Sequence, residues 1–229
     1  MSDPFFLLLL FGIPAISGLV SRQMRKRFVQ FSSDPMPLTG QQAAERMLFE
    51  NGITDVQVIS TPGKLTDHYD PRNKTVNLSQ VVFSQSNVAA VAVATHECGH
   101  AVQDATGYAM LSLRSKMVPM LKVSNIALPV LAFGGAAVSQ MAGNHGTAIL
   151  CFFALGLPAL FSLITLPVEF NASRRALNWL EEVGIAKDDQ YLSARKALFW
   201  AAMTYVVAAL GAIIQALYFA KIFLGRGRH

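Results

Sequence analysis

Long apolar blocks separated by polar stretches dominate the pattern of this chain. A helix that crosses the hydrocarbon core of a membrane needs about 17–25 mainly apolar residues. Such blocks run from Pro4 to Val20, Pro119 to Ala142, Thr147 to Leu166 and Phe199 to Phe219. The pattern therefore predicts a mainly α membrane protein with a four-helix transmembrane bundle.

The polar stretches between these blocks predict five segments. They are an N-terminal transmembrane anchor (1–20), a domain that carries the motif described below (21–118), a transmembrane hairpin (119–166), a helical segment (167–198), and a C-terminal transmembrane helix with a basic tail (199–229). The basic residues next to the blocks predict which side of the membrane each segment faces.

Basic residues follow the first block directly, at Arg22, Arg25, Lys26 and Arg27. Positive charges flank membrane helices mainly on the cytoplasmic side. We therefore expect a multi-pass protein of the cell (inner) membrane in which segments 21–118 and 167–198 face the cytoplasm. The basic tail then lies outside, against the charge rule, so full crossing by the last helix stays open.

Composition agrees with a membrane protein, because 52% of the residues are hydrophobic and 14% are charged. The net charge of +5 comes from basic residues that gather at the edges of the apolar blocks rather than along one polar face. This placement indicates contact with the lipid bilayer, and no nucleic-acid partner is expected.

The domain between the first two blocks is predicted to be a small α+β fold. Its periodicity predicts a helix from Gln41 to Asn51, a strand around Val56 to Ile59, a hairpin of His68-Tyr69 and Thr75 to Leu78 joined by the turn Asp70 to Asn73, and a helix from Ser86-Asn87 to Gly107. The hairpin either covers the core or offers an edge on which a peptide substrate binds as an added strand.

The second of these helices contains the sequence His96-Glu97-Cys98-Gly99-His100. Positions four apart lie on one face of a helix, so both histidines can bind one metal ion while Glu97 takes a proton from water. A chance pair of buried histidines is a poor alternative in a chain with five histidines. An intramembrane site is a second alternative, but the charges of Glu97 and Asp104 favour a water-facing domain.

A catalytic zinc site needs a third protein ligand and one open position. Glu169 is the main candidate, because it follows Pro167 at the end of the third block, where the predicted topology returns it to the face of the motif. Asp104 is the rival, one turn beyond His100; it can instead orient a histidine from behind.

Three motifs resemble the YugP-like membrane zinc metallopeptidases of bacteria, a family of neutral zinc metallopeptidases. They are His68 to Arg72, Thr95 to Gln103 and Pro167 to Ala176. The resemblance covers essentially the full length and is similar in layout to the HtpX-type and CAAX-prenyl-type membrane proteases. It implies a zincin-like, gluzincin-like metalloprotease domain at the cytoplasmic face, with Glu169 as the third ligand.

Further candidate site residues come partly from the resemblance and partly from the residues themselves. Ser173 stands where the wider group has an aspartate, and with Asp104 it is our candidate for an outer partner of the ligands. His68 and Asn171 are the candidates for binding the substrate or stabilising the oxyanion.

Together these features predict a zinc metallopeptidase that holds one Zn2+ per chain and uses Glu97 as its catalytic base. Its expected substrates are polypeptides, namely membrane or membrane-proximal proteins cut at the cytoplasmic face. The alternative is a non-catalytic zinc-binding membrane scaffold or chaperone-partner protein. Glu97 distinguishes the two, since a structural zinc site is normally closed by four protein ligands and needs no base.

Overall fold

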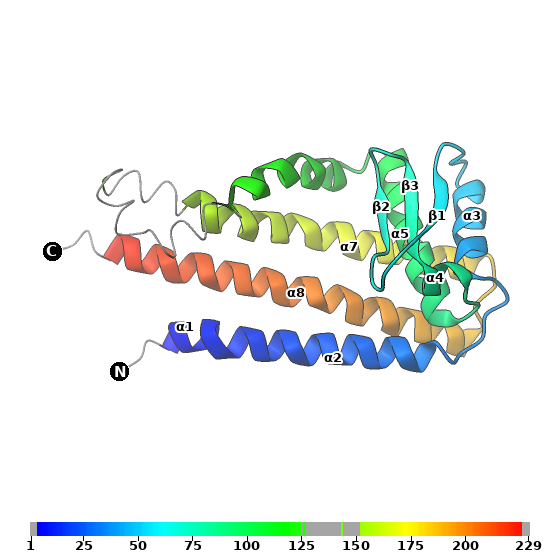
Figure 1. The fold of residues 1–229 in the computed structure, drawn as a ribbon, viewed down its shortest axis with the longest axis horizontal. Helices are drawn as coiled ribbons and strands as arrows, with labels where there is room; N and C mark the ends of the chain where they lie inside the picture. Colours follow the sequence, from blue (N-terminus) through cyan, green and yellow to red (C-terminus); the bar gives the residue numbers. More distant parts are fainter. Residues whose placement is uncertain (1–3, 125, 127–142, 144–151, 226–229) are drawn as a thin grey trace. The chain divides into compact units, whose positions relative to one another are not determined.

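The computed structural model describes residues 4–124, 126, 143 and 152–225, which are mainly helical with one small mixed sheet (Figure 1). Contacts divide the chain into two compact units. The first comprises Met1–Leu19, Leu113–Leu166 and Thr204–His229, and the second comprises Val20–Ser112 and Pro167–Met203. Three long helices run from one unit into the other, so each unit is described separately.

The first unit is built from the apolar parts of long helices. They belong to α1 (Pro4–Leu7), the π-helix η1 (Leu8–Gly12), α2 (Ile13–Phe31), a helix over residues 109–124, the π-helix η2 (Phe152–Gly156), α7 (Leu157–Glu182) and α8 (Asp188–Gly225). Large apolar side chains remain exposed on them, with Phe11 and Leu19 both 64% exposed. Exposed apolar side chains of this size are expected where lipid is the solvent.

Three helices in the described part of the chain are long and apolar enough to cross a membrane: Pro4–Phe31, Ala154–Glu182 and Asp188–Tyr218. They contain the first predicted block, the third block from Ala154 onward and the fourth up to Tyr218; residues 147–151 of the third block lie outside the described residues. The second predicted block, Pro119 to Ala142, lies mostly outside the described residues, so the transmembrane hairpin (119–166) remains a prediction.

These helices extend well beyond the apolar blocks that predicted them. The first continues to Phe31, and α7 passes through Pro167 instead of ending there. Hydropathy marks where a helix is apolar, not where it ends. The polar continuation of α7 buries small and apolar side chains, including Ala172, Ala176 and Leu180, in the second unit.

The second unit contains a three-stranded sheet in the order β1-β3-β2 within the described residues. Strand β1 (Gln57–Thr61) is parallel to β3 (Thr75–Ser79), and β2 (His68–Asp70) is antiparallel to β3. The turn between β2 and β3 is stabilised by Asp70, whose carboxylate accepts hydrogen bonds from the backbone N–H of Arg72 and the side chain of Asn73. The predicted hairpin is confirmed, and β2 lies at one edge of this sheet.

Helices of the second unit pack around a core of both small and large apolar side chains. Helix α3 (Gly40–Glu50) begins at a capping box of Thr39 and Gln42, a short α4 (Gln80–Ser84) follows the sheet, and α5 (Val88–Ala105) carries the motif. The cap of α5 is Asn87, whose side chain accepts a hydrogen bond from the N–H of Ala90. The helix stops just before Gly107, which has a φ of +64°. The predicted helix over the motif is therefore confirmed.

Candidate active site

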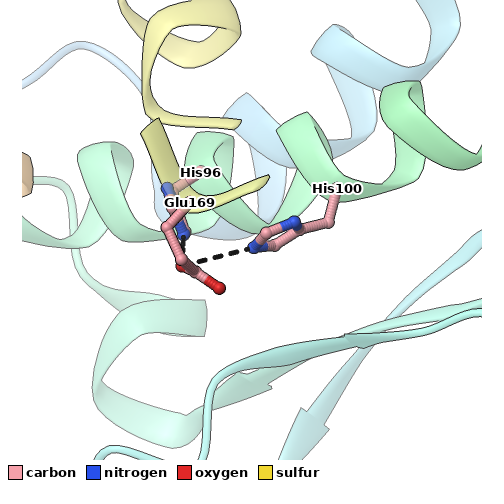
Figure 2. Close-up of side chains that lie close together, drawn as sticks. All are labelled: His96, His100 and Glu169. Atoms are coloured by element: carbon pink, nitrogen blue, oxygen red, sulfur yellow. Dashed lines mark ion pairs between the residues drawn. The ribbon is translucent and has the colours of Figure 1, made fainter. Parts of the chain in front are cut away.

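The two motif histidines and Glu169 come together in the second unit, as Figure 2 shows. Oε2 of Glu169 lies 3.3 Å from Nε2 of His96 and 3.7 Å from Nε2 of His100. The histidines extend from α5 and the glutamate from α7. Glu169 and His100 are buried, and His96 is partly buried.

Gly99 allows α7 to approach α5 closely enough for this cluster to form. A Cβ atom at position 99 would lie 2.5 Å from the carbonyl oxygen of Ala172. No side chain fits there without moving α7, which carries Glu169 three residues before Ala172. The glycine between the histidines therefore sets the spacing of the two helices.

Gln103 fixes which nitrogen of His100 carries the proton. Its Nε2 donates hydrogen bonds to the backbone oxygen of Val168 at 2.8 Å and to Oδ1 of Asn171 at 3.0 Å. Because a carbonyl oxygen only accepts, Oε1 of Gln103 must be the atom that faces Nδ1 of His100, 3.0 Å away. Nδ1 of His100 is then the N–H donor, and Nε2 presents a lone pair towards Glu169.

Ser173 has the equivalent position behind the other histidine. Its hydroxyl lies 3.1 Å from Nδ1 of His96, so Nε2 of His96 is directed towards Glu169. Ser173 is on α7, one turn after Glu169. One helix thus supplies both a carboxylate and the hydroxyl that orients a facing imidazole.

The arrangement of these atoms fits a divalent cation such as zinc. Two imidazole nitrogens and a carboxylate oxygen converge, and the ligand atoms of the three residues all lie within 4.8 Å of one another. Ligands at about 2.0–2.1 Å from a tetrahedral zinc ion are about 3.3–3.4 Å apart. The distance of 3.3 Å from His96 to Glu169 matches this value, and the distance of 3.7 Å from His100 to Glu169 is slightly longer. Three ligands also leave a fourth position for water or substrate.

Glu97 is buried beside this cluster. Its Oε2 accepts a hydrogen bond of 3.1 Å from the backbone N–H of Tyr69 on the edge strand β2. Glu97 is adjacent to His96 on α5, and the three-residue cluster does not include it. This separates the candidate base from the candidate ligands.

Asp104 belongs to a different group of side chains. Its Oδ2 accepts hydrogen bonds of 2.8 Å from the hydroxyl of Tyr69 and from Nζ of Lys74. Burial alone would raise the pKa of Asp104. The two hydrogen bonds lower the pKa by more than burial raises it, so it lies below the ordinary value of 3.8. Glu169, not Asp104, is grouped with the histidines, and Gln103 rather than Asp104 lies behind His100.

The two candidates for the oxyanion lie outside the cluster. His68 is exposed, and its Nδ1 lies 2.7 Å from the backbone oxygen of Thr66. Asn171 uses its Oδ1 to accept hydrogen bonds from Gln103 and from Nε of Arg175 at 2.9 Å. The structure therefore gives Asn171 a place behind His100.

Gln103 is the site residue that the sequence did not suggest. Two signals could have identified it: it follows His100 by three positions on the helix, and it is a polar residue in a helix predicted to be buried. A polar side chain that is fully buried requires hydrogen-bond partners, and here those partners are a candidate ligand and the backbone next to another candidate ligand.

Comparison with known proteins agrees with this geometry. A family model described as "Putative neutral zinc metallopeptidase" matches residues 5–224. A Bacillus subtilis (strain 168) protein described as "Putative membrane protease YugP" is 40% identical over 186 residues, which is 81% of each chain. No solved structure is significantly similar to the chain. The family model covers nearly the whole length, and the chain therefore belongs to this family of zinc metallopeptidases.

Proposed function

We propose that the chain is a gluzincin-like, zinc-dependent endopeptidase with a zincin-like domain on a four-helix transmembrane bundle. It hydrolyses peptide bonds of membrane or membrane-proximal proteins at the cytoplasmic face of the cell membrane. The observation that carries this proposal is the convergence of His96, His100 and Glu169, with Glu97 beside them on the same helix.

In this proposal His96, His100 and Glu169 hold one Zn2+. Bound there, the ion would polarise the scissile carbonyl group and lower the pKa of a water molecule. Gln103 and Ser173 keep both imidazoles turned towards the ion. An outer partner of this kind typically changes metal affinity or activity by about 10–100-fold when it is removed.

Glu97 is the general base of the proposed reaction. The N–H of Tyr69 holds one carboxylate oxygen, Oε2, so the other oxygen can accept a proton from the attacking water. Glu97 then passes this proton to the leaving amine. A carboxylate next to the ligands but outside the cluster suits this role.

The outer edge of β2 is the proposed binding site for the substrate chain. The N–H of Tyr69 turns away from β3 and towards Glu97, so this edge faces the candidate base. Because the N–H of Tyr69 is already bonded to Glu97, an extended peptide would pair with this edge through the backbone oxygen of Tyr69, whatever the sequence of the peptide. This mode suits an endopeptidase that cuts unfolded or extended segments.

The continuity of α7 supports action close to the membrane surface. Glu169 follows an apolar stretch of the same helix and comes two residues after Pro167, where the second unit begins. The basic cluster after the first apolar block supports a cytoplasmic site. Membrane proteins and segments beside them are therefore the proposed substrates.

Replacing Glu97 tests this proposal against a non-catalytic zinc scaffold. We expect Glu97→Gln to retain about one zinc per chain and to lower the cleavage of fluorescent casein by about 10²–10⁴-fold. Glu181→Gln, which changes an exposed glutamate on α7, is the matched control and should cleave like the wild type. Equal cleavage by Glu97→Gln and the wild type would rule out this mechanism.

A further inference from the structure

We infer that Tyr69 is a positioning residue for Glu97, and that Asp104 and Lys74 hold Tyr69 in place. The inference rests on the proposed peptidase function. It concerns the base alone, because the orientation of the ligands is secured separately by Gln103 and Ser173.

Tyr69 contacts the motif helix at two points. Its backbone N–H donates to Oε2 of Glu97 at 3.1 Å, and its hydroxyl donates to Oδ2 of Asp104 at 2.8 Å. Glu97 and Asp104 are seven residues apart on α5, which places them on one face and about 10.5 Å apart along the axis. One tyrosine therefore ties the edge strand to the helix over two helical turns.

Strand pairing explains why the backbone of Tyr69 reaches Glu97. Tyr69 lies opposite Val76 in the antiparallel pair of β2 and β3. In such a pair, alternate residues direct their N–H and C=O groups away from the partner strand. Tyr69 is one of these outward residues, so a shift of β2 along the helix moves the donor that Glu97 uses.

The hydroxyl of Tyr69 is held by the partly buried carboxylate of Asp104, which also accepts a hydrogen bond from Lys74. Nζ of Lys74, at the end of the β2–β3 turn, donates to the same oxygen of Asp104 at 2.8 Å and lies 3.7 Å from Oδ2 of Asp55. Burial, followed by the hydrogen bond to Asp104, raises the pKa of Tyr69, so its phenol is protonated and donates at neutral pH. The hairpin is thereby fixed to the second half of α5.

Loss of this anchor should affect catalysis more than metal binding. A general base acts only within hydrogen-bond reach of the proton that it removes, and small displacements lower the rate. Without the phenol oxygen, β2 is free to move relative to α5, and Glu97 loses its fixed donor. The two histidines keep their own supports, Gln103 and Ser173, and Glu169 lies on another helix, α7, so zinc affinity should remain.

The test uses the full chain in detergent, with Tyr69→Phe and Asp104→Leu as the variants; leucine has a similar shape to aspartate but offers no acceptor to the Tyr69 hydroxyl. Glu50→Gln is the matched control, because Glu50 also accepts hydrogen bonds from an aromatic donor, Trp179, and from a basic residue, Arg46, away from the cluster. The measurements are amide hydrogen exchange at Tyr69, zinc content, and the kcat and KM for fluorescent casein.

We expect both variants to speed amide exchange at Tyr69 by about tenfold and to lower kcat by about tenfold, with KM and zinc content unchanged. The kcat of the double variant should be no lower than that of either single variant, since both changes break the same hydrogen bond between Tyr69 and Asp104. Glu50→Gln should leave the exchange rate and kcat unchanged.

Unchanged exchange at Tyr69, or a kcat lowered equally by Glu50→Gln, would overturn the inference. Failure of the proposed function would look different: the wild type and Glu97→Gln would cleave casein equally. Amide exchange reports on the contact between Tyr69 and Glu97 whether or not casein is cleaved, so it decides the inference in that case as well.

Discussion

Each motif histidine presents Nε2 to the site because another side chain engages its Nδ1. For His100 the direction is fully determined, since Gln103 is itself oriented by the backbone oxygen of Val168. Val168 directly precedes Glu169, so Gln103 links two candidate ligands on different helices. Among the residues that support the candidate ligands, Gln103 should therefore have the largest effect on zinc affinity when it is replaced.

We expect Gln103→Met to raise the zinc dissociation constant by about 10–100-fold, because the nearly isosteric side chain cannot orient His100. Competition with a chelator of known affinity measures this constant. Gln190→Met is the control, since Gln190 also bonds a backbone oxygen, that of Pro35, away from the cluster. Equal zinc affinity in Gln103→Met and the wild type would refute this role.

The sequence predicted the cluster of His96, His100 and Glu169 because each of these residues can be recognised from its position in the sequence alone. The histidines have a fixed spacing on a helix, and Glu169 is a carboxylate at the end of an apolar block. The roles of Gln103 and Ser173 depend on how α5 and α7 pack. Such contacts between segments far apart in the chain cannot be derived from periodicity.

Among the elements, the hairpin and the motif helix are joined by charged and hydroxyl groups that respond to pH. Because the pKa of Asp104 is lowered in the folded state, its contribution to stability is present above the ordinary value of 3.8 and is lost as pH falls through the lower folded value. Lys74 has a raised pKa, chiefly through its hydrogen bond to Asp104. Its contribution is present below 10.5 and is lost at higher pH.

The pH prediction compares the wild type with Asp104→Asn by thermal unfolding. We expect the wild type to melt about 2–4 °C higher near pH 7, because asparagine keeps an acceptor oxygen but loses the charge that strengthens the hydrogen bonds from Tyr69 and Lys74. This difference should shrink as the pH falls below the ordinary Asp104 value of 3.8. A difference that stays constant down to strongly acidic pH would contradict the assigned pKa direction.

Elements with strong local signals were predicted well, and those set by packing were not. The capping residues and the glycine turn fixed α5, and the Asp70 turn fixed the hairpin. Helix α4 was missed. A helical segment after Pro167 was predicted, but not that it continues the apolar helix without a break. Local sequence argues against a helix through a proline, whereas burial of Ala172 and Leu180 in the second unit favours it.

For the whole molecule, the two units differ in the surface that they expose. The first exposes large apolar side chains on helices that are long enough to cross a membrane, whereas the second buries a core around α3, α5 and the sheet. Four crossings, one of them mostly outside the described residues, would place the second unit in the cytoplasm and the N-terminus outside.

Single cysteines on a background with Cys98→Ala and Cys151→Ala test this orientation. We expect a membrane-impermeant maleimide to label Ser2→Cys in intact bacterial cells, and to label Ser84→Cys, on the exposed side of α4, only after permeabilisation. Labelling of Ser84→Cys in intact cells would reverse the proposed orientation. His229→Cys reports in the same way on whether the last helix crosses completely.

The central claim is that Glu169 completes the metal site of the two histidines, and zinc content per chain tests it most directly. The measurement compares Glu169→Ala with Asp104→Ala after dialysis against a weak chelator. We predict about one zinc per chain in the wild type and in Asp104→Ala, and an affinity lowered by more than about 100-fold in Glu169→Ala. Full zinc retention by Glu169→Ala, with loss in Asp104→Ala, would contradict the account.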